Sequence, residues 1–352
     1  VSASAPLNTT VINVTAISTD PVFAATLATA AANQLIRVVE QIETTDAAMG
    51  SPVRLTVVQE AEVPSAPTSP KKALSVALGL LLGLALGVAV ALVRAALDTK
   101  IRNEKDLTRL TDLPVLGGIV FDPKAKDRPL IVHEDSNSPR AESFRQLRTN
   151  LQFLDAGRPE RAFVVTSAIP GEGKSTTTAN LAIALAQAGA KVLLVGADLR
   201  KPRMAHYMGI EGGLGLTDVL IGRVELADAI QRWGRTDLYL LPSGQIPPNP
   251  SELLGSALMD DLIERLHKEF DVVLYDAPPL LPVTDAAVLS RLVGGCLVLV
   301  ASGKTTAAEL DTGLATLENV GARVSGIVLT MLPTKGPDAY GYGRYGFAYQ
   351  QD

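Results

Sequence analysis

The sequence predicts an α/β protein with a mostly parallel sheet and helices on both faces. One transmembrane helix and part of an α+β extracytoplasmic domain are predicted to precede it. Three observations carry this prediction. From residue 161 onward, short apolar runs rich in β-branched residues alternate with helical stretches. Residues 73–93 are uninterruptedly apolar, and residues 168–175 form a glycine-rich loop between a strand and a helix.

Composition limits the classes of function. The chain has 352 residues and a net charge of −5, which allows two or three domains and gives no basic excess for binding nucleic acid. Its single cysteine, Cys296, lies in an apolar run that predicts a buried strand, and it excludes a disulfide within the chain. The three histidines are scattered and indicate no metal site (His133, His206 and His267). Val1 in place of a methionine indicates a fragment or a processed product.

Residues 1–70 are rich in Thr, Ala and Val and are predicted to form the extracytoplasmic part. The alternation in residues 9–19 predicts a strand, and Asp20-Pro21 opens a helix that extends to about Ile42. Residues 53–63 read as a second strand. A stiff connector with proline at every third position follows (Pro64, Pro67 and Pro70).

Residues 71–95 are predicted to cross a membrane. The run from Ala73 to Val93 contains no charge and is long enough for a bilayer, which disfavours the alternative of a buried core helix. Lys and Arg continue after it, which favours a cytoplasmic C-terminal side, although Lys71 and Lys72 before it weaken this argument. The P-loop described below decides the orientation, because ATP is cytoplasmic, and residues 1–70 are therefore predicted to lie outside. Glycine recurs at every fourth position and would let helices pack closely (Gly79, Gly83 and Gly87).

The loop at residues 168–175 is predicted to bind the phosphates of a nucleotide. A buried strand at residues 162–166 leads into it and a helix rich in alanine and leucine leaves it, which together form a P-loop. Lys174 can reach the β- and γ-phosphates, and the Ser175 hydroxyl can bind Mg²⁺. The alternative is an ordinary glycine-rich turn, and the usual first glycine is here Ala168. The predicted nucleotide-binding residues are Pro170, Gly171, Glu172, Gly173, Lys174, Ser175 and Thr176.

Two acids end predicted strands near this loop. Asp198 follows the strand at residues 191–195, and its alternative is a helix N-cap. Asp276 ends the strand that begins at Asp271, where a partner of Ser175 in holding Mg²⁺ is expected. Further strands and helices alternate to the end of the domain, with strands at 238–242, 295–302 and 323–330 and helices at about 251–269, 285–292 and 305–319.

The domain predicted to hold the P-loop spans residues 140–333, after a linker at 96–139 with a polar helix at 99–110 and a strand at 113–121. It opens on a helix with one charged face, formed by Glu142, Arg145 and Arg148. From spacing alone this face is a solvated surface with weak ion pairs.

Residues 334–352 form a glycine-rich tail. Four of the seven tyrosines lie in it (Tyr340, Tyr342, Tyr345 and Tyr349). Clustered tyrosines on a flexible tether are poor core material and accessible phosphoryl acceptors, and the alternative is a disordered tail used for binding.

Taken together, these features resemble the bacterial tyrosine autokinases that are fused to a polysaccharide co-polymerase, or chain-length determinant, domain. The ordered set is a transmembrane helix, the ExxRxxR helix, PGEGKST, ADLRKP, LYDAPP followed by Thr-Asp-Ala, and the tyrosine cluster. The resemblance covers nearly the whole chain, and the family's usual earlier membrane helix is absent here.

The resemblance implies an autokinase that uses ATP and Mg²⁺. Lys174, Asp198 and Asp276 would be catalytic, and Ser175, Asp198 and Asp276 would position Mg²⁺. Glu142, Arg145 and Arg148 would join subunits into a homo-oligomeric ring in the cell membrane. The tail tyrosines of one subunit would then be phosphorylated by its neighbour. The implied partners are the polysaccharide polymerase and export machinery and a tyrosine phosphatase.

Two positions depart from the family pattern. Gly196 stands where an acid usually helps to bind Mg²⁺ or takes the tyrosine proton, and Thr330 stands where relatives often have Asn near the adenine. The first departure leaves open a nucleotide-binding co-polymerase scaffold with weak or no kinase activity. A partitioning-type ATPase would carry a further lysine at Ile169 and would lack the membrane helix and the tail. A plain membrane-anchored structural protein would leave the P-loop unexplained.

Overall fold

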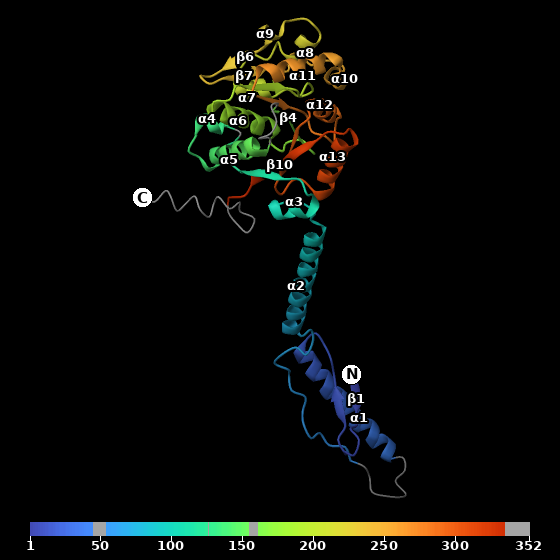
Figure 1. Ribbon diagram of the computed structural model, residues 1–352. Helices are drawn as coiled ribbons and strands as arrows, with labels where there is room; N and C mark the ends of the chain where they lie inside the picture. The colour runs from blue at the N-terminus through green and yellow to red at the C-terminus, as the bar shows by residue number, and fades with distance from the viewer. Residues whose placement is uncertain (45–53, 126, 155–160, 335–352) are drawn as a thin grey trace, which may run out of the picture. The chain divides into compact units, whose positions relative to one another are not determined.

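The computed structural model describes residues 1–44, 54–125, 127–154 and 161–334, and the chain divides into two compact units, Val1–Ala95 and Ala96–Asp352 (Figure 1). The first unit holds β1 (Ser2–Ser4), β2 (Asn13–Thr15), α1 (Pro21–Thr44) and most of α2 (Lys72–Leu97). β1 and β2 pair antiparallel, and α1 begins at the predicted Asp20-Pro21, where Asp20 accepts a hydrogen bond from the Val22 amide at 2.9 Å.

The second strand predicted in this unit does not form. The described part of it, residues 54–63, is irregular and mostly exposed. Its alternation of apolar and polar residues fits a sheet face, but the described residues supply no strand beside it, and an unpaired strand is not stable in water. The β2 strand lies inside the predicted 9–19 segment and is only three residues long.

Two helices in the described part of the chain are long and apolar enough to cross a membrane. They are Pro21–Ile42, with mean hydropathy 1.4, and Lys72–Leu97, with mean hydropathy 2.7. The first contains Arg37 and Glu40, whereas the second has no charge between Lys72 and Arg94. The second is the segment predicted from sequence to span a membrane, and it is the stronger candidate because a buried charge in lipid is costly.

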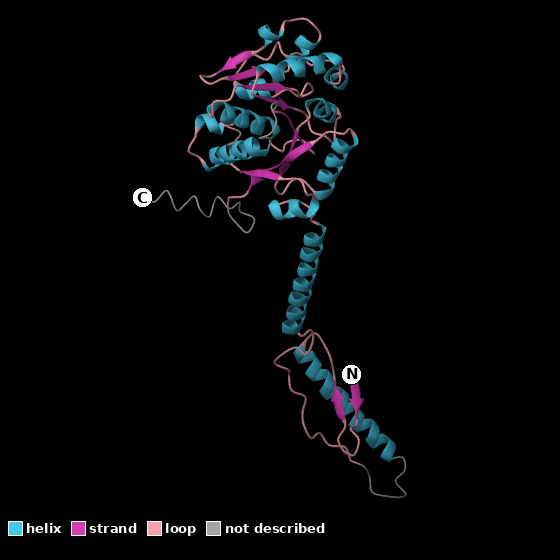
Figure 2. Ribbon diagram, viewed as in Figure 1, coloured by secondary structure: helices cyan, strands magenta, loops and turns pink. Residues whose placement is uncertain are grey.

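The second unit is built on one sheet, whose strands are drawn in magenta among cyan helices in Figure 2. The sheet has eight strands, in the order β3-β10-β9-β4-β8-β5-β7-β6. All neighbours are parallel except β6 and β7. The fold class predicted from sequence is therefore confirmed. The strands are β3 (Val115–Val120), β4 (Ala162–Ser167), β5 (Val192–Gly196), β6 (Gln231–Trp233), β7 (Leu238–Leu241), β8 (Val272–Asp276), β9 (Cys296–Ala301) and β10 (Val324–Leu332).

Helices cover both faces of this sheet, and each face has its own hydrophobic core. Because side chains alternate along a strand, Val164 packs into one core and its neighbour Val165 into the other. One core is closed by α4 (Ile131–Glu134), α5 (Pro139–Leu154), α6 (Lys174–Gln187) and α7 (Met204–Met208). The other is closed by α3 (Glu104–Leu110), α8 (Leu216–Leu220), α9 (Leu226–Ala229), α10 (Pro250–Leu254), α11 (Ala257–Glu269), α12 (Asp285–Val293) and α13 (Ala307–Asn319).

Two helices differ from their predicted bounds. The stretch 251–269 is broken into α10 and α11 at Gly255, where an added Cβ would lie 2.9 Å from a Val288 methyl. The helix predicted from residue 99 begins only at Glu104, where Asn103 and Asp106 form a capping box.

The backbone before α3 instead runs beside the turn that follows β9. Ile101 donates to the Thr305 carbonyl at 2.9 Å and accepts from the Gly303 amide at 2.8 Å. Ala307 donates to the Thr99 carbonyl at 2.9 Å, and Ile101 is 1% exposed. The predicted linker at 96–139 therefore also contributes packed elements to this unit, among them β3, which pairs with β10.

Candidate functional site

The P-loop lies between β4 and α6 and has the geometry of an anion cradle. Gly171 and Gly173 have φ of 76° and 88°, a region that an L side chain rarely adopts, and the chain turns there into the helix. The first amides of α6 have no partner inside the helix, so they are available to an anion. Ala168 is fully buried and has no positive φ, and α13 accommodates its methyl group by presenting Gly313, whose added Cβ would lie 3.4 Å away.

The buried side chain of Glu172 fixes the shape of this loop by hydrogen bonds. Its carboxylate is fully buried and accepts hydrogen bonds from the Ile169 amide at 2.9 Å and the Ala301 amide at 3.0 Å. The Thr305 hydroxyl donates to it as well. The Glu172 side chain is thus occupied by bonds within the protein, and only its backbone amide is available to bind a phosphate.

The sheet brings the predicted acids to the same edge as the P-loop. β8 lies between β4 and β5, and Asp276 is in register with Val165 on one side and Gly196 on the other. Asp276 is 1% exposed and accepts a hydrogen bond from Ser175. Burial raises the pKa of Asp276 to about 7, against the lowering effects of Ser175 and Lys174.

Lys174 and Asp198 complete the group. Burial lowers the pKa of the Lys174 ammonium, while the charges of Asp276, Asp198 and Glu172 oppose this shift. The Asp198 carboxylate accepts hydrogen bonds from the Arg200 amide at 3.2 Å and the Lys201 amide at 2.9 Å. These bonds order the loop after β5 and cap no helix, because α7 begins at Met204.

These residues fit a magnesium ion held together with phosphates. The Asp276 Oδ1 atom is buried and has no hydrogen-bond partner within the described part of the chain, which is the state expected of a ligand atom awaiting a cation. No cluster of three or more His, Cys, Asp or Glu side chains that could hold a metal occurs among the described residues. Mg²⁺ needs no such cluster, since one or two carboxylates, a hydroxyl, phosphates and waters satisfy it.

Three charged side chains near this site were given no role from the sequence, namely Arg200, Asp285 and Lys304. Arg200 forms a two-pronged ion pair with the fully buried Asp285, at 2.7 and 3.0 Å, and Ser251 donates to the same carboxylate. Burial raises the pKa of Asp285, but the bonds from Arg200 and Ser251 outweigh it and hold that pKa below its usual value. Lys304, in the turn after β9, donates to the carbonyls of the P-loop. The sequence placed Arg200 and Asp285 inside motifs, whereas nothing local marked Lys304.

The place of the missing acid at Gly196 is filled by Ser243. A Cβ on Gly196 would lie 2.6 Å from the Ser243 Oγ atom and 3.0 Å from its amide nitrogen. The Ser243 hydroxyl donates to the Gly196 carbonyl at 2.7 Å. The glycine therefore fits a local packing in which Ser243, just after the end of β7, occupies the space that a side chain at residue 196 would need. Thr330 is the second position that departs from the family pattern. Its hydroxyl is occupied by a hydrogen bond to the Glu172 carbonyl at 2.8 Å.

The predicted subunit-contact residues lie on α5. Arg145 pairs with Glu142 at 2.5 Å in the same chain and also donates to the Ser136 carbonyl. Arg148 is half-buried and turns toward α6, 3.5 Å from the Ala184 carbonyl. The predicted acceptors Tyr340, Tyr342, Tyr345 and Tyr349 lie outside the described residues.

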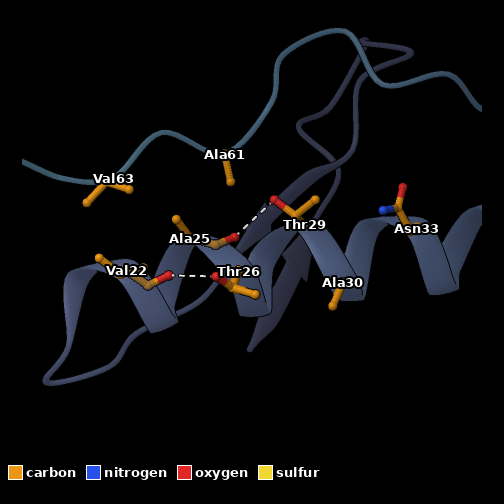
Figure 3. A pocket seen from close by; sticks show the side chains of 8 residues that line it. All are labelled: Val22, Ala25, Thr26, Thr29, Ala30, Asn33, Ala61 and Val63. Atoms are coloured by element: carbon orange, nitrogen blue, oxygen red, sulfur yellow. Dashed lines mark hydrogen bonds between the residues drawn. The ribbon is translucent and has the colours of Figure 1, made fainter.

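The first unit has a pocket of about 430 Å³ on α1 (Figure 3). Its two threonine hydroxyls donate to helix carbonyls, Thr26 to Val22 and Thr29 to Ala25. The lining contains no ionisable group and therefore offers no means of acid–base or phosphate chemistry. It consists of Val22, Ala25, Thr26, Thr29, Ala30, Asn33, Ala61 and Val63.

Two family models match the chain. Residues 162–317, from β4 to α13, match an AAA domain, and residues 27–96 match a G-rich domain, GNVR. The first match covers the P-loop and both acids. The second covers most of α1 and nearly all of α2, so both units of the chain have recognised relatives.

Named relatives and a solved structure agree with these matches. The tyrosine-protein kinase YwqD of Bacillus subtilis is 38% identical over 215 residues, which is 61% of this chain and 91% of YwqD. The tyrosine-protein kinase Etk of Escherichia coli K12 is 30% identical over 295 residues, 78% of this chain and 41% of Etk. The structure of the BceF tyrosine kinase domain superimposes with a TM-score of 0.62 at 32% identity, over 66% of this chain and 100% of that one.

Proposed function

Because this chain belongs to the bacterial tyrosine-protein kinases, we propose that it is a membrane-anchored autokinase that transfers phosphate from ATP to its own C-terminal tyrosines. The observation that carries the proposal is the meeting of Lys174, Ser175 and Asp276 at one edge of the sheet, where the Asp276 Oδ1 atom has no hydrogen-bond partner among the described residues. The P-loop amides, Lys174 and the glycines would hold the triphosphate, and Ser175, Asp276 and Asp198 would hold Mg²⁺. The ion supplies charge neutralisation between the phosphates.

The transfer itself needs positioning more than covalent chemistry. A tail tyrosine oxygen forms a bond to the γ-phosphorus as the bond from that phosphorus to the bridging β–γ oxygen breaks, and ADP leaves. Asp198 is the remaining carboxylate able to take the phenolic proton, which then passes to water. Since Gly196 supplies no acid, we expect a slower reaction than an enzyme with two acids would give.

The reaction would occur between subunits of a ring. The charged face of α5, with Glu142, Arg145 and Arg148, would form the subunit contact, and the tail of one subunit would enter the site of the next. Each phosphate adds a charge of roughly −1.5 to −2, so several on one tail would repel neighbouring tails and loosen the ring.

The assembly would act on polysaccharide made at the membrane. The chain is homologous to membrane-associated tyrosine autokinases of polysaccharide production, and its G-rich match includes the candidate membrane helix α2. We propose that residues 1–70 lie outside and residues 95–352 in the cytoplasm. Cycling between ring and monomer would then adjust polymer length, with the polymerase and export machinery and a tyrosine phosphatase as partners.

The test is phosphate mapping. The full chain is incubated with ATP and Mg²⁺, and its peptides are analysed by mass spectrometry. We expect phosphate on one or more of Tyr340, Tyr342, Tyr345 and Tyr349, and its loss in Lys174→Met. A tail without phosphate would refute the autokinase.

The alternative is a nucleotide-binding scaffold without kinase activity, which Gly196 leaves open. The kinase names of the relatives favour the autokinase. Gly196→Asp separates the two, since tail phosphorylation that appears only with this acid would mean that the natural chain has lost the activity, whereas a gain over measurable phosphorylation of the natural chain would mean a slow kinase. The packing around Gly196 requires that Ser243 be changed with it.

A further inference from the structure

Lys304 reaches the P-loop from a distant part of the chain. It follows Gly303, which turns the backbone at φ 70°, in the connection from β9 to α13. Its ammonium donates to the Pro170 carbonyl at 2.7 Å and the Gly171 carbonyl at 2.9 Å. The approach is so close that a Cβ on Gly171 would lie 2.7 Å from the Lys304 Nζ atom. The side chain remains exposed, so a ligand can reach it.

The turn that carries Lys304 is fixed to the same loop. Thr305 donates to the buried Glu172 carboxylate, and the Ala301 amide donates to it at 3.0 Å. The Lys304 amide donates to the Ala301 carbonyl at 3.1 Å. The lysine and the P-loop are therefore held together before any ligand arrives, which lowers the entropy cost of forming a joint site.

The Lys304 ammonium and the neighbouring Lys174 are suited to binding an anion. An ammonium has three N–H donors, and the two carbonyls take two of them. Lys304 also lies close enough to Lys174 for its charge to help lower the pKa of that lysine, after the larger effect of burial. Two cations at one loop repel each other, and a polyanion between them converts that repulsion into attraction.

We propose that Lys304 is a second lysine ligand of the terminal phosphate of ATP, supplied by the β9–α13 turn. Lys174 is the residue that reaches the β- and γ-phosphates, and the Lys304 ammonium is bonded to the same loop at Gly171, three residues before Lys174. Position 169, early in the loop, holds isoleucine, and the second cation is supplied from outside the loop, by the turn after β9. The inference rests on the ATP binding proposed above, and it adds a group that distinguishes ATP from ADP.

The experiment measures the Kd of ATP and of ADP, each with Mg²⁺, by calorimetry on the full chain in detergent. We expect Lys304→Met to weaken ATP binding about tenfold or more, because one hydrogen bond between charged groups is lost. The Kd of ADP should change by less than about twofold. Lys304→Arg should recover part of the ATP affinity because it keeps the charge. The control Lys268→Met removes an exposed charge from the last turn of α11, which leads into the opposite end of β8, and should change neither constant.

Two results would overturn the inference. An equal loss for ATP and ADP would make Lys304 a clamp on the loop alone, and unchanged constants would give it no role at the site. Failure of the kinase proposal has a different signature, because a wild-type chain that binds ATP but leaves its tail unphosphorylated refutes the autokinase and leaves the Lys304 measurement intact. Melting temperatures of the variants show whether the loop has kept its fold.

Discussion

Gly196 and Ser243 show how a single position can be constrained by its neighbour across strands. A side chain at residue 196 would begin 2.6 Å from a hydroxyl that is itself bonded to the Gly196 carbonyl. Contacts of this length force a neighbour to move, and overpacking of a core costs about 1–3 kcal/mol. The glycine is therefore explained by packing as well as by any change in catalysis.

We predict that Gly196→Asp alone lowers the stability of the protein by about 1–3 kcal/mol, because Ser243 must shift. Adding Ser243→Ala removes the obstructing hydroxyl and should restore part of the loss. Urea denaturation of the wild type, both single variants and the double variant gives the coupling energy between the two sites. Strictly additive effects would show that the two side chains do not compete for space.

Asp276 makes the stability of the ligand-free protein depend on pH. Its pKa is about 7 in the fold and near 4 in an unfolded chain, so between these values the folded state binds the extra proton. The contribution of this group to stability is therefore fully present below about pH 4 and is lost as pH rises through about 7.

We predict that Asp276→Asn raises the melting temperature of the ligand-free protein at pH 8, since no buried charge must form, and that the gain shrinks at pH 5. Differential scanning fluorimetry across this range measures it. Asp261→Asn, an exposed acid on α11, is the matched control and should show no such trend. The same Asp276 variant should lose the contribution of Mg²⁺ to ATP affinity. A pH-independent difference would contradict the assigned protonation.

At the scale of elements, Asn180 ties α4 and the segment before it to the P-loop helix α6. This fully buried side chain accepts from the Val132 amide at 3.0 Å and donates to the Pro129 and Thr176 carbonyls, both at 2.7 Å. The segment before the charged face of α5 is thus bonded directly to the helix that begins at Lys174. Arg148 of α5 also lies 3.5 Å from the Ala184 carbonyl of α6, so the proposed subunit contact and the proposed nucleotide site adjoin the same helix.

We predict that replacing both Glu142 and Arg145 by alanine reduces assembly and leaves the fold nearly unchanged. Their ion pair is partly exposed, and such pairs contribute about 0–1 kcal/mol. Light scattering on the detergent-solubilised chain reports the mass of the assembly. The control pair Arg232 and Asp237, bonded at 3.1 Å and more exposed, lies at the β6 edge and should not affect mass. An unchanged mass distribution for the α5 variant would remove these residues from the contact.

Most elements of the second unit could be predicted from sequence because each carries its own local signal. The apolar β-branched runs mark strands, and the order strand, glycine loop and Lys-Ser places the P-loop. The bonds that complete the site have no such signal, since Thr305 and its partner Glu172 are 133 residues apart. Likewise, residues 54–63 alternate as a strand does, but alternation does not specify a partner strand, and among the described residues none is there. The start of α3 was misplaced because residues 99–102 pair with a turn two hundred residues away.

At the scale of the whole molecule, Cys296 makes the proposed membrane topology simple to test. The thiol is fully buried in β9, as predicted from its apolar run, and burial raises its pKa to about 12. Such a thiol is almost entirely protonated at neutral pH and reacts slowly. Labelling of a cysteine introduced at an exposed position therefore reports on which side of the membrane that position lies, with little background from Cys296.

We predict that Ser65→Cys reacts with a membrane-impermeant maleimide in intact cells, and that Lys105→Cys reacts only after permeabilisation. Both positions are exposed, one before α2 and one after it. The wild-type chain, with Cys296 alone, provides the background. Labelling in the reverse order would invert the proposed orientation.

The pairing of residues 99–102 with the turn after β9 decides where the protein can be cut for work in solution. Removing everything before Glu104 would take away Ile101 and strip the backbone bonds at Thr305, Gly303 and Ala307 from the turn that carries Lys304. A truncation that starts at Ala96 would keep them. We therefore expect the shorter version to bind ATP more weakly than the whole chain, so assays on it would understate the nucleotide binding that we propose.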